Sequence, residues 1–239
     1  MNKIKFSILM IFIFILSFSS CQLIPYKDQP QNDIKRYDGS YSVSFICGDI
    51  CMANAIIEIK DGAIDGQVQN IKQQSFYVIG YVSQNGDLQL QSISVDSEES
   101  IEAYGTINNN GTVNGTYQVD DRNCKLLGFC FKTNRNEIVK QYDGTYQIEL
   151  IRAGKQMATS QFTIKNGEFH TSIATINNDL YKLDGKISKE GNIIFNTLFS
   201  NKDKGLTVIG TINKEGVVKG DYYTNSGSKG VFSGKKINK

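Results

Sequence analysis

Cysteine and histidine carry the most reactive side chains in this 239-residue sequence, and both are scarce. There are five cysteines and a single histidine, His170. Histidine is the commonest acid or base of catalysis, and cysteine can act as a nucleophile, bind zinc or form disulfides. His170 lies in an alternating segment that predicts a strand, where a lone histidine is typical of a surface position or of a structural residue with its hydrogen bonds satisfied. Phosphate-binding, zinc-protease and serine-hydrolase motifs are missing from the sequence. We therefore predict no enzyme, no catalytic residue, no bound metal and no cofactor.

The first twenty residues have the pattern of a secretory signal. Lys3 and Lys5 give a positive start, and the apolar run over 6–16 is too short to span a bilayer. The segment Phe18-Ser19-Ser20-Cys21 resembles the lipobox of bacterial lipoproteins, in which a peptidase cuts before a cysteine that carries acyl chains. Lipoboxes prefer leucine where Phe18 stands, whereas the small residues before Cys21 fit. The resemblance implies lipidation at Cys21, and an ordinary signal peptide is the alternative.

The residue after Cys21 bears on the location. Gln22 is not the aspartate that resembles an inner-membrane retention signal, so we expect a lipid anchor in the cell envelope, at the outer membrane or the cell surface. Residues 21–36 contain both prolines, Pro25 and Pro30, among polar residues, which predicts a tether. The membrane is thus the first expected partner, reached through the acylated Cys21.

The four cysteines beyond Cys21 form an even set in an oxidising compartment, which predicts two disulfides. Three connectivities are open for Cys47, Cys51, Cys124 and Cys130. Local pairing within 47–51 and within 124–130 is slightly favoured, and the rival joins the first strand to the last. A four-cysteine zinc site is a further alternative, but neither pair has the two-residue spacing common in such sites.

The sequence repeats itself at a distance of 105 residues. Tyr37-Asp38-Gly39-Ser40-Tyr41 aligns with Tyr142-Asp143-Gly144-Thr145-Tyr146, and glycines recur at the same shift further along. A period this long predicts two whole domains rather than a solenoid of short units. We assign 1–20 to the signal peptide, 21–36 to the tether, 37–135 to the first domain and 136–239 to the second.

Each repeat alternates apolar and polar residues with the two-residue period of half-buried strands. In the first repeat we place strands near 39–47, 51–60, 63–70, 75–83, 87–94, 101–108, 112–119 and 125–132. The fold class is therefore all-β, with two tandem copies of an antiparallel meander of about eight strands, either a barrel or a flattened sandwich. Glycine turns such as Asn85-Gly86 should gather at one end of each meander, and longer loops at the other. Loops on a rigid scaffold are the usual recognition surfaces.

The two repeats carry opposite charge. Residues 37–135 contain 12 acidic and 6 basic residues, a net −6, and residues 136–239 contain 10 acidic and 15 basic residues, a net +5. The contrast is sharpest in one pair of equivalent loops, which are the candidate binding loops: Asp96, Glu98 and Glu99 against Lys202 and Lys204. Mutual attraction between domains, a partner for the basic repeat such as an anionic protein or polysaccharide, and mere solvation of charged faces are the three alternatives. The whole-chain charge of +2 argues against nucleic acid as a partner.

The lipobox together with the glycine- and tyrosine-punctuated meander resembles bacterial surface lipoproteins built of tandem barrels, of the transferrin-binding type. The resemblance implies a membrane-anchored, extracytoplasmic binding module without enzymatic activity. A lipocalin-like carrier of a small ligand and a structural envelope lipoprotein are the alternatives. The carrier would need a hollow barrel, and eight strands are few enough for side chains to fill the interior.

Overall fold

The protein folds almost entirely into β-strands. The computed structural model describes residues 34–70, 74–94, 100–133, 139–176, 180–197 and 205–238. Within these ranges sixteen strands follow one turn of 3₁₀ helix, η1 (Lys35–Tyr37), and no helix is long and apolar enough to span a bilayer. The strands are β1 (Gly39–Cys47), β2 (Ile50–Lys60), β3 (Ala63–Asn70), β4 (Ser75–Val82), β5 (Asp87–Ser94), β6 (Ser100–Ile107), β7 (Thr112–Val119), β8 (Arg122–Thr133), β9 (Gly144–Arg152), β10 (Lys155–Ile164), β11 (Glu168–Thr175), β12 (Leu180–Ile187), β13 (Asn192–Thr197), β14 (Leu206–Ile212), β15 (Val217–Thr224) and β16 (Lys229–Asn238).

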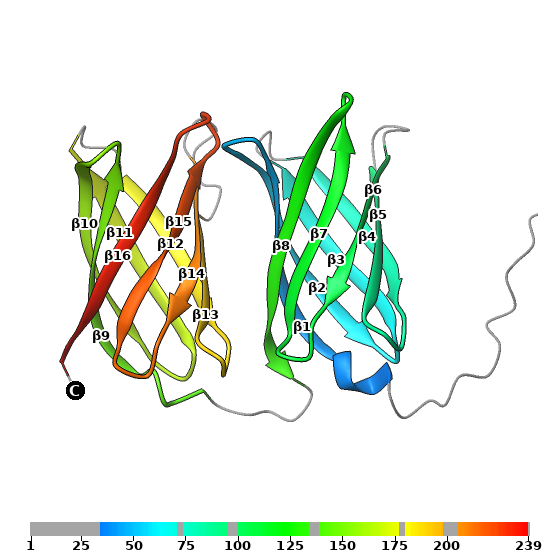
Figure 1. Ribbon diagram of the computed structural model, residues 1–239, viewed down its shortest axis with the longest axis horizontal. Helices are drawn as coiled ribbons and strands as arrows, with labels where there is room; N and C mark the ends of the chain where they lie inside the picture. The colour runs from blue at the N-terminus through cyan, green and yellow to red at the C-terminus, as the bar shows by residue number, and fades with distance from the viewer. Residues whose placement is uncertain are drawn as a thin grey trace, which may run out of the picture. The chain divides into compact units, whose positions relative to one another are not determined.

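These strands form two closed antiparallel barrels (Figure 1). In the first barrel, β1 to β8 each pair with their neighbours in sequence, and β8 returns to pair with β1. The second barrel, β9 to β16, has the same order and closes where β16 pairs with β9. A single parallel pair, Ile50 with Thr224, joins β2 to β15. The predicted all-β fold of eight-stranded meanders is confirmed, and the meanders close as barrels.

Inward-pointing side chains fill the described interior of each barrel. Along β6, Ala103 and Ile107 are buried in the first core, whereas Tyr104 between them is exposed. The second core is built around packed aromatic rings: the ring of Phe169 is stacked on that of Phe162 and meets that of Phe195 edge to face, with ring centroids 4.5 Å apart in both pairs. A lipocalin-like carrier would need empty space where these side chains lie.

Tight turns attach each hairpin to the strand that follows it. Gly86, between β4 and β5, has a φ of +88°, which a residue with a side chain rarely adopts. Its carbonyl oxygen accepts a hydrogen bond from the backbone N–H of Ile107, at 2.7 Å, on the next strand. The same bond recurs at the other five tight turns, where the acceptor carbonyls belong to Gly62, Gly111, Gly167, Gly191 and Gly216. In each barrel these turns gather at one end, as the sequence predicts (Figure 1).

The repeated Tyr-Asp-Gly-x-Tyr motif makes the same two hydrogen bonds at the start of the first strand of each barrel. In the first barrel, the Asp38 carboxylate accepts the backbone N–H of Asp61 at 2.8 Å, and the Tyr41 hydroxyl donates to the Tyr37 carbonyl at 2.8 Å. The second barrel makes both bonds 105 residues later at the same distances, from Asn166 to Asp143 and from Tyr146 to Tyr142. The motif therefore has a structural role. Ile34, just before η1 and within the range assigned to the tether, is buried with it.

Buried tyrosines make the barrels sensitive to alkaline pH. Burial raises the pKa of Tyr146 and of Tyr223 to about 12, while an unfolded chain ionises tyrosine near its ordinary value of about 10. Because the folded state holds these protons longer, their contribution to stability is complete below pH 10 and is lost as the pH rises through 12. We expect the melting temperature to fall across this window, measured by circular dichroism. Tyr146→Phe should reduce the fall, whereas the control Tyr77→Phe, which removes an exposed hydroxyl, should leave it unchanged.

Candidate interaction surfaces

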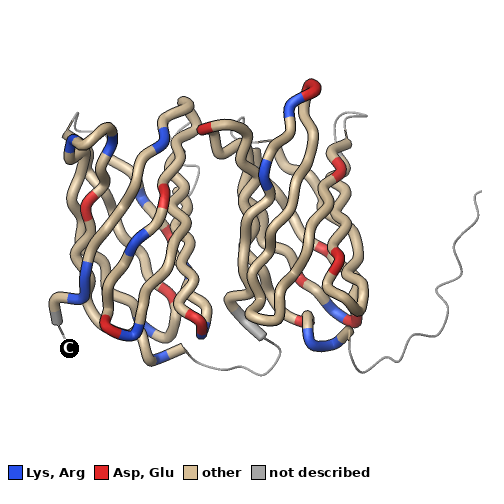
Figure 2. Tube along the Cα trace, viewed as in Figure 1, with Lys and Arg blue, Asp and Glu red and all other residues tan. Residues whose placement is uncertain are grey.

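The loops predicted as binding sites can be placed only in part. Asp96, Glu98, Glu99, Lys202 and Lys204 lie outside the described residues, so their role stays a prediction. Four connections at the same ends of the barrels are described: those between β1 and β2, β7 and β8, β9 and β10, and β15 and β16. Among the described residues no lysine, arginine, aspartate or glutamate is fully buried, and Figure 2 shows these residues along the chain trace.

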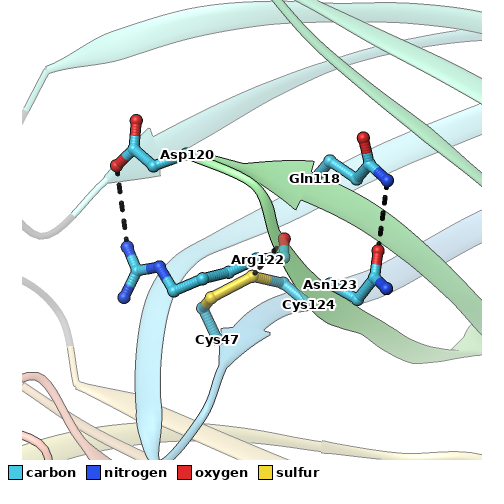
Figure 3. The surroundings of a disulfide bond; sticks show 6 residues. All are labelled: Cys47, Gln118, Asp120, Arg122, Asn123 and Cys124. Carbon is cyan, nitrogen blue, oxygen red and sulfur yellow. Dashed lines mark hydrogen bonds and ion pairs between the residues drawn. A yellow bond between two sulfur atoms is a disulfide. The ribbon is translucent and has the colours of Figure 1, made fainter.

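A disulfide joins Cys47 at the end of β1 to Cys124 near the start of β8 (Figure 3). This is the pairing of first strand with last, so the slightly favoured local scheme, Cys47 with Cys51 and Cys124 with Cys130, is wrong. The physical reason is barrel closure, which brings the Cα atoms of Cys47 and Cys124 within 4.4 Å. The hairpin turn beside the bond is held by an ion pair between Arg122 and Asp120 at 3.7 Å.

The prediction of a second disulfide is also wrong in this structure. Cys51 and Cys130 both belong to strands that flank β1, but Cys51 pairs with Ile46 and Cys130 with Tyr41. Five residues along a strand separate these positions by about 16 Å, whereas bonded cysteines need Cα atoms within about 7 Å. Both residues are thiols in this structure.

Cys51 is buried in a small cluster with Ile46 and Tyr223. Its sulfur accepts a hydrogen bond from the Thr207 hydroxyl at 3.3 Å, and its thiol donates to the carbonyl of Ala53 at 3.5 Å. Burial raises the pKa of the Cys51 thiol to about 11, which disfavours the reactive thiolate. This cysteine is therefore a packing residue rather than a nucleophile.

His170 lies on the outer surface of the second barrel, where its Nδ1 contacts the Asp184 carboxylate. Its side chain is mostly exposed, and a second pair on the same strands joins Lys186 to Glu168 at 2.5 Å. Within the described ranges, no three histidine, cysteine or acidic residues are grouped as a metal site would require. This placement is the surface position that the sequence favours for His170.

The largest group of exposed apolar side chains lies on the outer face of the first barrel. We call it the tyrosine face, and it consists of Ile56 on β2, Tyr77, Ile79 and Tyr81 on β4, Ile93 on β5 and Tyr104 on β6. The three tyrosines are 51 to 55 % exposed. Around the barrel, β5 is the fourth strand from β1 in either direction, so this face lies opposite β1, whose residues are all buried.

Strand register brings these side chains side by side. Tyr77 is directly opposite Ile93, and Gln89 stands between Tyr81 and Tyr104. Opposed residues on neighbouring strands lie about 5 Å apart, so the face is continuous across β4, β5 and β6. Exposed apolar groups of this kind mark interaction surfaces more often than scattered single residues do.

Carboxylates are interleaved with the apolar side chains of the tyrosine face. Asp65 on β3 is opposite Ile79 on β4. On the other side, Gln91 on β5 lies between Ile79 and Glu102 on β6. The Tyr104 hydroxyl donates to the Glu102 carboxylate at 2.5 Å. This hydrogen bond raises the pKa of Tyr104. The face can therefore offer aromatic surface together with negative charge.

The second barrel differs at the positions equivalent to the outward residues of β4. Residues 105 positions later on β12 are Lys182, Asp184 and Lys186, where β4 has Tyr77, Ile79 and Tyr81. Both triplets point outward from the same place in the same meander. The scaffold therefore does not need tyrosine here, and the apolar side chains of β4 are not explained by the fold.

The tyrosine face is a feature that the sequence analysis missed. β4 reads Tyr77-Val78-Ile79-Gly80-Tyr81, which is apolar on both faces and resembles a strand buried on both sides. The signal that could have revealed it is the repeat itself, because the positions equivalent to Tyr77, Ile79 and Tyr81 are charged in the second repeat.

Comparisons with known proteins give low similarity. No family model and no curated protein matches the sequence. One solved structure that matches is an agglutinin from Burkholderia oklahomensis, with 7 % identity and a TM-score of 0.21, over 88 % of this chain and 99 % of that chain. Another is the isotype 1 transferrin binding protein B from serogroup B Neisseria meningitidis, with 8 % identity and a TM-score of 0.28, over 83 % of this chain and 75 % of that chain. A third is the Myxococcus xanthus hemagglutinin in complex with a mannopentaose, with 9 % identity and a TM-score of 0.18, over 82 % of this chain and 99 % of that chain. Likenesses at these TM-scores carry no argument about the ligand of this chain.

Proposed function

We propose that this chain is a non-enzymatic binding protein, anchored by acyl chains on Cys21 and displayed at the outer membrane or the cell surface. The observation that carries the binding role is the tyrosine face, a group of exposed aromatic and aliphatic side chains with polar residues between them, on a closed barrel. Surfaces that combine aromatic anchors with charged groups are typical of recognition. The anchor rests on the resemblance of residues 18–21 to a lipobox and on the signal-like segment before it.

Anchoring would give a surface of this kind two advantages. Acyl chains hold the protein firmly, because each buried methylene group contributes about 0.8 kcal/mol. Confinement to a membrane also raises the local concentration of the protein, so weak contacts become effective. Opposite charges on the two barrels provide a further means of selecting a partner. An anionic protein or polysaccharide is one partner that the charge of the second barrel would suit.

Replacing the lipidated residue tests the anchor directly. We expect Cys21→Ser to abolish incorporation of radiolabelled palmitate and to move the protein out of the detergent phase on phase separation, because the acyl attachment sulfur is lost. The matched control is Cys130→Ser, which should keep both label and partition.

Protease treatment of intact bacteria then locates the wild-type protein. Digestion in intact cells supports surface display, and digestion only after permeabilisation places the protein beneath the outer membrane. Palmitate labelling that survives Cys21→Ser would contradict the proposed anchor.

A further inference from the structure

We propose that copies of this chain associate head to tail, with the tyrosine face of one copy against a basic face on the second barrel of the next. The proposal rests on the proposed binding function and names a second copy as the partner. It is carried by two complementary surfaces that the same chain leaves exposed.

The basic surface lies on the outer face of β15 and β16. We call it the lysine face, and it consists of Val217, Lys219, Lys229, Val231 and Lys235. Register places Val217 beside Lys235 and Lys219 beside Ser233, so lysines and valines alternate over two neighbouring strands. Val217 and Val231 are 45 % and 50 % exposed. Half-buried Asp221 and Glu149 are among the acidic groups near these lysines, as is Asp49 near Tyr223, over whose ring the Lys229 ammonium lies.

The chemistry of the two faces is complementary. The tyrosine face carries the carboxylates of Glu58, Asp65 and Glu102 at exposed positions on β2, β3 and β6, against a single lysine, Lys60. A lysine can lay its apolar stem on a tyrosine ring while its ammonium group reaches a neighbouring carboxylate. The valines of the lysine face supply the apolar contact that the rings and isoleucines need. The net charges of the two repeats, −6 and +5, favour the same encounter at longer range.

The two faces can meet only between copies. Tyr77 and Tyr81 on one face and Val217 and Val231 on the other are all exposed in the same chain, so the faces do not cover each other. Contact between two different surfaces of identical chains is heterologous, and it produces a ring or an open row of molecules. The first barrel of each copy would then bind the second barrel of its neighbour.

The size of the tyrosine face sets the expected strength. From β2 to β6 it spans four strand spacings, about 19 Å, and from Tyr77 to Tyr81 it extends about 13 Å along the strand. This is small for a specific interface, so we expect a dissociation constant in solution of roughly 0.1 to 1 mM. Such a contact is effective only where an anchor concentrates the protein in two dimensions.

The experiment uses residues 22–239, the chain without signal and lipid, in sedimentation velocity from about 10 µM to 1 mM. We expect association that grows with concentration and weakens at least roughly tenfold between about 50 and 500 mM salt. Tyr77→Ser with Tyr81→Ser should weaken it by a similar factor. The matched control is Lys182→Ser with Lys186→Ser at the equivalent positions of the second barrel, which should associate like the wild type.

Charge reversal in trans identifies the two faces. Asp65→Lys with Glu102→Lys should abolish association of that chain with itself, and Lys219→Glu with Lys235→Glu should do the same. In a mixture, both faces of the first variant are basic and both faces of the second are acidic, so each variant can pair only with the other. The mixture should therefore regain complexes in which the two variants alternate. Circular dichroism spectra matching the wild type show that the substitutions leave the fold intact.

The outcomes separate this proposal from the proposed function. A chain that stays monomeric at 1 mM, or a mixture that fails to regain complexes while each variant is folded, overturns self-association. The same proteins are also tested on an array of neutral and acidic glycans, the alternative ligands of the tyrosine face. If the wild type binds a glycan and Tyr77→Ser with Tyr81→Ser abolishes this binding, the tyrosine face binds a glycan. The proposed binding function then stands, and a second copy is excluded as the partner of this face. If the wild-type protein incorporates no palmitate, the proposed lipid anchor is refuted, and the sedimentation result is unaffected.

Discussion

Replacing Cys47 and Cys124 with alanine is expected to lower the free energy of unfolding of the first barrel by about 4 kcal/mol. The bond closes a long loop, since 77 residues separate the two cysteines, and a loop of this length greatly restricts the unfolded chain. A loss of this size increases the population of the open form roughly a thousandfold. Hydrogen exchange measured by mass spectrometry should show this loss of protection in peptides from β1 to β8.

The second barrel provides an internal reference for the same experiment. It contains no cysteine, so reduction of the wild-type protein should leave the exchange of β9 to β16 peptides nearly unchanged. Cys130→Ser controls for loss of a thiol outside the disulfide and should be milder than the double substitution. Equal loss of protection in both barrels would mean that they unfold as one unit, and no loss would mean that the bond contributes little.

Gly185→Ala is expected to destabilise the second barrel by about 3 kcal/mol. A Cβ atom built at Gly185 would lie 1.8 Å from the ring of Phe169, which is directly opposite on β11. That ring cannot move aside easily, because it is stacked on Phe162 and in edge contact with Phe195. Thermal unfolding followed by circular dichroism should show a melting temperature lower by roughly 10 to 20 °C.

Two further variants show that this effect comes from the ring. Gly205→Ala in the same barrel brings its Cβ atom no closer than 3.4 Å to Asn225, so it should be nearly neutral. Phe169→Ile imitates the first barrel, where Ile64 is opposite Gly80 at the equivalent pair. Combined with Gly185→Ala it should cost less than the sum of the single changes, because the smaller side chain admits the added methyl group. Strict additivity would contradict this explanation.

Much of the fold could be predicted because its determinants are local. Alternation placed the strand expected at 63–70 at the bounds of β3, and the strand expected at 51–60 begins one residue earlier, at Ile50. Turn glycines such as Gly86 located the hairpins, because a positive φ is a property of the residue itself. Sequential pairing of such strands then produces a meander.

The disulfide and the tyrosine face depend on information that local patterns do not contain. Cys47 meets Cys124 only because the last strand closes on the first, so spacing within 47–51 or 124–130 could not decide the pairing. Tyr77 and Tyr81 look like core residues in sequence, and only their alternation with buried Val78 in the structure shows that they point outward.

Barrel closure also orders the events of folding. Every strand of the first barrel pairs with a neighbour in sequence except where β8 meets β1, so a chain that emerges from its amino end can add hairpins one at a time. Cys47 belongs to β1, which is synthesised first, and Cys124 belongs to β8, which is synthesised last in this barrel. The geometry that holds their Cα atoms 4.4 Å apart therefore exists only once β8 has paired with β1. A bond formed in that geometry seals a barrel whose last strand is already in place.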